Sequence, residues 1–308
     1  MRETKTFQTR FQTQHLTILE YDDNPWNRPS PFHSVNNLTL TIHQKYNFIP
    51  MNPDSAGNIQ DSDKKSFPAK NWTEEEWLKT CNEFIGIANH YWDNKFWLHI
   101  PDSCHKFDYL YQGLYIRPNI KCRYNAEWVK STSTSVIQVK VANPNKSGFR
   151  SDNTDWTPED AQSTPNFTGN SQVTVVHEVG HNLDQTHVSG EKGNLKDYGG
   201  RNPNPKSPKY HPSKNIMGGG MTFTEINALP WQLAMQEFTN INSTEWKASM
   251  MELFPGSVEL IHSPIRAGYL EQYTEMELYT GAKTIVLPEI VMSGRVRHHG
   301  NPHKAHKR

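Results

Sequence analysis

The chain has few cysteines, and they are not arranged in pairs. Cys81, Cys104 and Cys122 are the three in a chain of 308 residues, and no CxxC pair occurs. An odd, sparse set is poor material for a disulfide framework and fits a chain that folds in a reducing compartment. It also argues against a cysteine zinc site, so we expect three buried thiols.

Long apolar runs and an excess of one charge are also missing. No stretch of about 18 apolar residues occurs, so we expect no membrane span. The N-terminus lacks the apolar core of a signal peptide, so we expect a cytoplasmic protein or one exported by a signal-independent route. Lys+Arg and Asp+Glu both total 32. No basic field therefore points to nucleic acid as a partner.

What the composition does contain is typical of a soluble, loop-rich protein. Hydrophobic residues make up 34% of the chain, with 20 Pro and 18 Gly. This favours many short elements over a helical bundle. A chain of this length can bury a sizeable core without disulfides, as one large domain or two modest ones.

Two segments predict ordinary helices. Thr73 and Glu76 have the spacing of a capping box, and apolar residues recur at helical spacing from Trp77 to Trp92. A later helix is expected to begin near Pro230, because proline is favoured in the first helical turn.

Several short stretches read as strands because they are rich in β-branched and aromatic residues with alternating polarity. Residues 51–71, by contrast, are polar and read as a linker or long loop, and residues 143–170 form a second polar stretch. The predicted strands are His15–Tyr21, Asn37–His43, Phe96–Ile100, Tyr109–Ile116, Ser135–Val141, Ser257–His262, Met276–Tyr279 and Thr284–Val291.

The segment from residue 177 to residue 187 reads HEVGHNLDQTH and carries the chemistry. Residues four apart on a helix lie on one face, so His177 and His181 can direct both imidazoles at one ion. Zinc bound by three histidines keeps an open position for water and lowers the pKa of that water to about 7. Glu178, next to the first ligand, can then act as the general base.

Chance is a poor explanation for this string. With 15 histidines in the chain, the residue frequencies predict about 0.04 HExxH strings. Requiring a further histidine six positions on, here His187, lowers the expected number to about 0.002.

The motif resembles the signature of the metzincin clan of zinc metallopeptidases, HExxHxxGxxH followed by a Met-turn. The match consists of His177, Glu178, His181 and His187, with Met217 in Asn215-Ile-Met-Gly as the turn methionine. The resemblance extends over residues 72 to 240. It implies a Zn²⁺ site with two ligands on a helix, a sharp turn before the third, a methionine beneath the metal, and peptide hydrolysis.

One position departs from the signature, because Asp184 stands where the clan has glycine. The helix must end between the second and third ligands, or His187 would lie about 9 Å further along the axis than His181. A left-handed residue ends a helix, and Asp adopts that conformation at a cost of roughly 1 kcal/mol. If the helix continued instead, Asp184 would share a face with His181, and His177, His181 and Asp184 would be an alternative ligand set.

Together these features predict an α+β protein with a small twisted mixed sheet, an active-site helix and a Met-turn. We expect a β-rich N-terminal segment over residues 1–70, which serves as a pro-segment or accessory part. A metzincin-like catalytic domain is expected over 71–245, and a β-rich segment with a basic, His-rich tail over 246–308.

The predicted function is that of a zinc-dependent endopeptidase, a monomer that acts on a protein or peptide, as a secreted or injected effector or toxin. Two alternatives stay open. One is a zinc amidase acting on a non-protein or cell-wall peptide substrate, and the other is a non-catalytic metal-binding protein.

Overall fold

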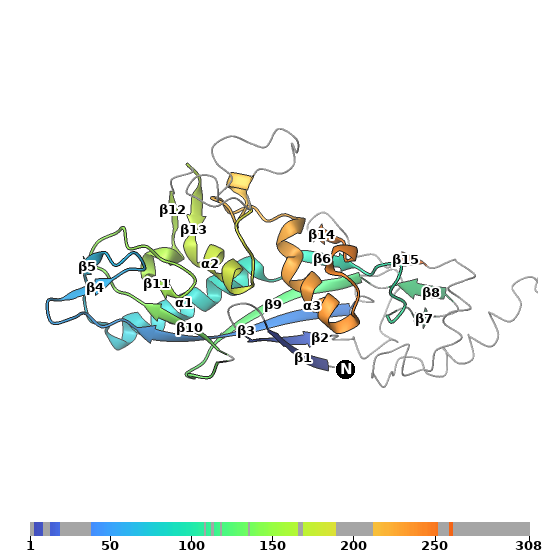
Figure 1. Cartoon of the computed structure of the whole chain (residues 1–308), viewed down its shortest axis with the longest axis horizontal. Coiled ribbons are helices and arrows are strands. Elements are labelled where there is room, and N and C mark those ends of the chain that lie inside the picture. The colour runs from blue at the N-terminus through green and yellow to red at the C-terminus, as the bar shows by residue number, and fades with distance from the viewer. Residues whose placement is uncertain are drawn as a thin grey trace, which may run out of the picture.

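The computed structural model describes residues 3–8, 13–18, 38–107, 109–111, 114–117, 119–134, 136–165, 169–188, 212–251 and 259–260. Within these ranges the chain combines three α-helices, a mixed β-sheet and small two- and three-stranded sheets (Figure 1). The predicted combination of helices with a mixed sheet is therefore confirmed.

An eight-stranded central sheet is the frame of the molecule. Along its main path the strands follow the order β1-β2-β3-β9-β6-β14, and β10 and β11 extend it beside β3. The pairs β3–β9, β3–β10 and β10–β11 are parallel, and the others are antiparallel. The bounds are β1 Glu3–Gln8, β2 Thr13–Ile18, β3 Leu38–Pro50, β6 Phe96–His99, β9 Asn119–Trp128, β10 Ile137–Val141, β11 Asp155–Trp156 and β14 Ala248–Met250.

Short elements surround this sheet. Two hairpins, β4–β5 and β12–β13, and the three-stranded sheet β15-β8-β7 complete the strands of the described residues. Their bounds are β4 Asn58–Gln60, β5 Ser66–Pro68, β7 Tyr109–Tyr111, β8 Leu114–Arg117, β12 Ser163–Pro165, β13 Ser171–Val173 and β15 Glu259–Leu260. The helices are α1 Glu74–Trp92, α2 Thr174–Asn182 and α3 Leu229–Thr239, with 3-10 turns η3 Pro158–Ala161, η5 Pro212–Lys214, η6 Glu225–Ala228 and η7 Ser243–Glu245.

The predicted first helix is confirmed together with its cap. The hydroxyl of Thr73 accepts a hydrogen bond from the Glu76 amide at 3.2 Å, and the Glu76 carboxylate accepts one from the Thr73 amide at 3.3 Å. The apolar face of α1 is buried against the central sheet. The predicted second helix, α3, begins with Pro230 in its first turn, as expected.

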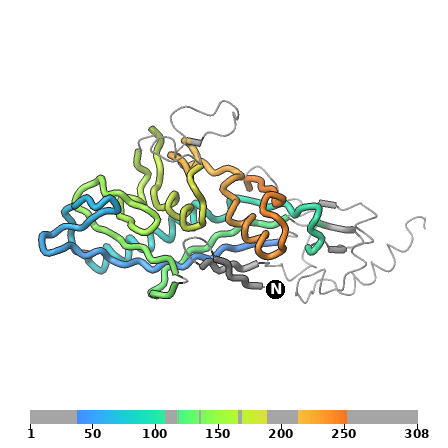
Figure 2. Tube along the Cα trace, in the orientation of Figure 1, coloured from blue at the N-terminus to red at the C-terminus, as the bar shows by residue number. Residues whose placement is uncertain are grey.

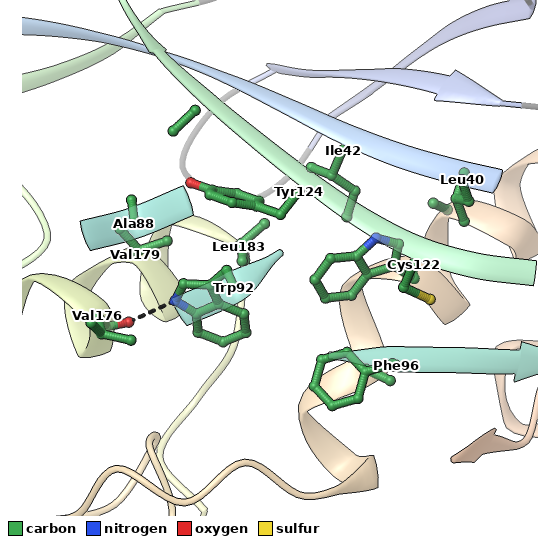
Figure 3. Close-up of a cluster of buried hydrophobic side chains, with 14 of the residues drawn as sticks. Leu40, Ile42, Ala88, Trp92, Phe96, Cys122, Tyr124, Val176, Val179 and Leu183 are labelled. Atoms are coloured by element: carbon green, nitrogen blue, oxygen red, sulfur yellow. Dashed lines mark hydrogen bonds between the residues drawn. The ribbon is translucent and has the colours of Figure 1, made fainter. Parts of the chain in front are cut away.

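The last turn of α1 fixes the next helix, α2. Trp92 is fully buried, and its indole nitrogen donates a hydrogen bond to the carbonyl oxygen of Val176 at 2.9 Å (Figure 3). Val176, Val179 and Leu183 lie in the same cluster as Leu40 and other side chains of the sheet (Figure 3). The core therefore lies between the sheet and α2, and packing against this core orients α2.

Two parts of the sequence interpretation were wrong in detail. Residues 51–71 are not a plain linker, since they contain the hairpin β4–β5. The single strand predicted at Tyr109–Ile116 is two antiparallel strands, β7 and β8. The predicted strands Met276–Tyr279 and Thr284–Val291 lie outside the described residues.

The longest strand that the sequence analysis did not predict is β9, which has ten residues and pairs with both β3 and β6. Its buried residues alternate with polar ones, as in Ile120, Cys122, Tyr124 and Ala126. Polar residues occupy the intervening positions, so the alternation is visible in the sequence. Residue preferences argue against a strand here, however, because Asn, Lys, Glu and Ala are depleted in strands and Ile120 is the one β-branched residue of β9.

The central sheet crosses both segment boundaries expected from the sequence. β3 precedes residue 71 and β14 follows residue 245, yet both are strands of the sheet that contains β6 and β9. The division into three segments stays a prediction. The three cysteines are buried and form no disulfide with one another, as expected. None of the described helices is long and apolar enough to cross a bilayer.

Candidate metal centre

The motif HEVGH lies within α2, a helix of nine residues. β13 leads directly into it, with Val173 as the N-cap residue. Val175, Val176 and Val179 are fully buried, which leaves His177 and His181 on an adjacent face. Figure 2 shows α2 beside the segment that follows residue 212, and this second segment carries Met217.

α2 ends as the sequence predicts, at a left-handed aspartate. Asp184 has φ of 63°, and its amide donates to the His181 carbonyl at 2.9 Å. The Gln185 amide donates to the Gly180 carbonyl at 3.0 Å. These two bonds define a Schellman motif, which reverses the chain after the last helical turn. The alternative in which the helix continues and Asp184 joins His177 and His181 is therefore wrong.

The reversal brings three imidazoles together. Their Nε2 atoms are 3.1 Å apart for His177 and His181, 3.2 Å for His181 and His187, and 3.3 Å for His177 and His187. A tetrahedral ion 2.0–2.1 Å from each nitrogen would hold the nitrogens about 3.3 Å apart. The triangle thus has the size that one small cation requires, and the three histidines form a group that could hold a metal ion.

Backbone carbonyls fix which nitrogen of two imidazoles faces the centre. His177 Nδ1 donates to the Ile216 carbonyl at 2.7 Å, and His181 Nδ1 donates to the Gln185 carbonyl at 2.8 Å. In a neutral imidazole the Nε2 atom then carries a lone pair, so two lone pairs face each other at 3.1 Å. Burial and the neighbouring histidines lower the pKa of His177 well below its usual value, so this ring stays neutral. A metal cation would relieve the repulsion between these nitrogens.

Glu178 lies next to the first of these histidines, and its side chain is 7% exposed. Burial, with repulsion from Asp160 and Asp152, raises its pKa well above the usual range. A buried carboxylate usually has hydrogen-bond donors around it. No hydrogen bond or ion pair to the Glu178 side chain occurs among the residues that the structure describes. Within the described residues, no protein donor therefore holds this buried carboxylate in place.

Met217, the expected turn methionine, is 1% exposed. Its segment is a tight turn in which the Asn215 carbonyl accepts from the amides of Gly218 at 2.9 Å and Gly220 at 3.1 Å. Gly220 is required here, because a Cβ on it would lie 2.1 Å from the Lys214 carbonyl oxygen. The carbonyl of Met217 also accepts from the amide of Val188, the residue after His187, at 3.1 Å. A backbone hydrogen bond thus joins the turn to the segment that carries the third histidine.

Met217 also packs directly on the ligand helix. A Cβ built on Gly180 would lie 2.2 Å from the Met217 sulfur and 3.1 Å from a ring carbon of Trp92. Gly180 lies immediately before His181, so the methionine touches the helix between its two histidines. The glycine in HEVGH therefore leaves room for the Met217 side chain, because it has no Cβ.

Gly180→Ala is expected to destabilise the protein even though alanine is the better helix former. Overpacking of a core position costs about 1–3 kcal/mol, which exceeds the roughly 1 kcal/mol gained from helix propensity. Gly86→Ala in α1 is the matched control, because a Cβ there meets nothing within 4 Å. Thermal unfolding should show a lower Tm for the first variant and a higher one for the second. Equal stabilisation by both would contradict the packing of Met217 on Gly180.

Gln172 is a polar residue of the site that was not predicted from the sequence. The Gln172 side-chain nitrogen contacts the carbonyl oxygens of Ile216, Gly218 and Gly220 at 3.0–3.2 Å, and His177 Nδ1 at 3.2 Å. Gln172 therefore links three carbonyls of the Met217 turn to the side of His177 that faces away from the other two histidines' Nε2 atoms. Its position five residues before His177 was the available signal, but a lone glutamine in a strand has no motif.

Comparison with known proteins found no matching family model, no matching curated protein and no matching solved structure. The interpretation of the site therefore rests on the geometry given above.

Proposed function

We propose that the chain is a zinc-dependent endopeptidase of the metzincin type. The observation that carries this proposal is the triangle of three Nε2 atoms, together with Glu178, which follows the first of these histidines in the chain and is buried with no hydrogen-bond donor among the described residues. A purely structural metal site would need the three histidines and no adjacent base.

His177, His181 and His187 would hold the metal, and each offers one imidazole nitrogen. Zinc held there would supply a Lewis acid and a bound water with a pKa of about 7. Glu178 would accept a proton at its carboxylate and pass it to the leaving amine of the cleaved peptide. Ile216 and Gln185, through their carbonyls, keep the imidazoles in the tautomer that presents Nε2.

The metzincin assignment has support from two further features. α2 ends in a sharp left-handed turn between the second and third histidines, and the buried Met217 packs against the same helix. Both features support the proposed resemblance, because the sequence motif leads one to expect a turn and a buried methionine at these positions. The N-terminal and C-terminal segments have no role in this proposal.

An unbiased cleavage assay tests the proposal. Peptides derived from a whole proteome would be incubated with protein loaded with one equivalent of zinc, and with the same protein after chelation. New peptide termini should appear only with the zinc-loaded sample, because the chelated protein lacks the group that activates water. If the zinc-loaded protein produced no new termini, or if chelation left the cleavage unchanged, the peptidase assignment would fail.

A further inference from the structure

Asn227 is a buried side chain near the candidate metal centre that has no place in the motif. It lies in η6, after the Met217 turn, and is 1% exposed. All hydrogen-bonding positions of its amide are occupied. Its nitrogen donates to Gln185 and Asn215, and its oxygen accepts from Asn215 and from the Thr224 amide.

Its first set of bonds holds the loop between the second and third histidines. Asn227 Nδ2 donates to Gln185 Oε1 at 3.1 Å, and the Gln185 side chain donates back to the Asn227 carbonyl at 3.0 Å. Gln185 is the residue whose own carbonyl accepts from His181 Nδ1. Both polar atoms of the Gln185 side chain are therefore hydrogen-bonded to Asn227, while the Gln185 carbonyl orients the second imidazole.

Its second set of bonds holds the Met217 turn. Asn215 Nδ2 donates to Asn227 Oδ1 at 2.9 Å, and Asn227 Nδ2 donates to Asn215 Oδ1 at 3.2 Å. The same Asn215 oxygen accepts from the Met217 amide at 2.8 Å. The next residue, Ile216, supplies the carbonyl that orients His177.

Asn227 is thus the junction between the two backbone segments that orient two of the three imidazoles. Buried amides bonded to one another have one arrangement that satisfies every donor and acceptor, so they fix the relative position of the segments that carry them. Removing one such amide leaves partners unsatisfied and lets the segments shift.

From this arrangement we infer that Asn227 is a positioning residue of the metal centre. It sets the spacing of the three Nε2 atoms by holding the Gln185 loop against the Asn215 turn, and it does not itself contact the ion. This inference rests on the metal-binding part of the proposed function, and it is independent of which bond the protein cleaves.

The test measures metal binding alone. Wild-type protein, Asn227→Ala and Asn47→Ala would be titrated with Zn²⁺ in competition with a chelator, and their Co²⁺ forms compared by visible absorption. Asn47 is the matched control, because its amide donates to the Gln138 side chain at 2.7 Å on β3 and β10, outside the metal centre. Asn227→Ala should weaken zinc binding by about 10- to 100-fold, as is typical for partners of metal ligands. Its Co²⁺ spectrum should change, while the control keeps the affinity and spectrum of wild type.

Three results would overturn the inference. They are a zinc affinity of Asn227→Ala within twofold of wild type with an unchanged spectrum, an equal loss in the control, and no zinc binding by wild type. The last would also remove the metal centre from the proposed function, whereas the first two would leave it in place. If Asn227→Ala does not fold, the zinc affinity and Co²⁺ spectrum of Gln185→Met are compared with those of wild type and the control instead. This second substitution removes the same amide link and leaves the bonds between Asn227 and Asn215.

Discussion

Glu178→Gln is expected to slow peptide hydrolysis by about 10²- to 10⁴-fold, the range typical for loss of a general base, while zinc stays bound. Glutamine has nearly the same shape as glutamate but cannot accept the proton. The three imidazole nitrogens are untouched by the change. The measurement is the rate of cleavage of a peptide found in the proteome assay, together with the zinc content of each sample.

Glu225→Gln is the matched control, because Glu225 is an exposed carboxylate in η6 that follows the Met217 turn. It should cleave at the wild-type rate. A Glu178→Gln enzyme that also cleaved at the wild-type rate with full zinc content would show that another group is the base. Loss of zinc from Glu178→Gln would show that this carboxylate belongs to the ligand set.

The same substitution should affect the stability of the zinc-free protein in a pH-dependent way. Burial raises the pKa of Glu178 above its unfolded value of 4.5. The folded protein therefore binds this proton more tightly than the unfolded chain does, and the carboxylate destabilises the fold as the pH rises above 4.5. Glu178→Gln should accordingly raise the Tm of zinc-free protein at pH 7, and the gain should disappear below about pH 4.

The second large effect concerns the third ligand. His187→Ala is expected to weaken zinc binding by more than the 10- to 100-fold that loss of a ligand's hydrogen-bond partner causes, because it removes one of three nitrogens outright. Asp184→Ala should keep the zinc and lose stability by about 1 kcal/mol, because alanine adopts the left-handed conformation less readily than aspartate. Zinc content after gel filtration and Tm are the two measurements.

These two variants distinguish a change in the backbone turn from the loss of a nitrogen that would bind the metal. Asp184 ends the helix and His187 supplies a nitrogen, so only the loss of His187 should weaken zinc binding directly. Retained zinc in His187→Ala together with loss in Asp184→Ala would reverse the ligand assignment and remove the metzincin interpretation.

The sequence predicts the metal group well because its determinants are local. Spacing along one helix places His177 and His181 together, and the tolerance of aspartate for positive φ predicts the turn at Asp184. The capping box at Thr73 is equally local. Each of these features depends on residues within a few positions of one another.

What the sequence could not predict depends on contacts between distant segments. The bond from Trp92 to Val176 and the packing of Met217 on Gly180 join residues far apart in the chain. Strand β9 was missed although its apolar and polar residues alternate, because it is rich in Asn, Lys, Glu and Ala, which are depleted in strands. Gln172, Gln185 and Asn227 were missed because a buried amide has no sequence signature until its partners are known.

The shortness of α2 has a consequence for how the metal site could be moved or copied. A nine-residue helix without a side-chain N-cap bond is too short to persist alone in water. α2 is helical here because Trp92 anchors its first turn and the valines on its inner face are buried. A synthetic peptide containing only residues 171–188 would be an unfolded chain with three scattered histidines. The arrangement of the three histidines thus belongs to the folded protein, and grafting the eleven residues of the motif into another protein would transfer the side chains without their geometry.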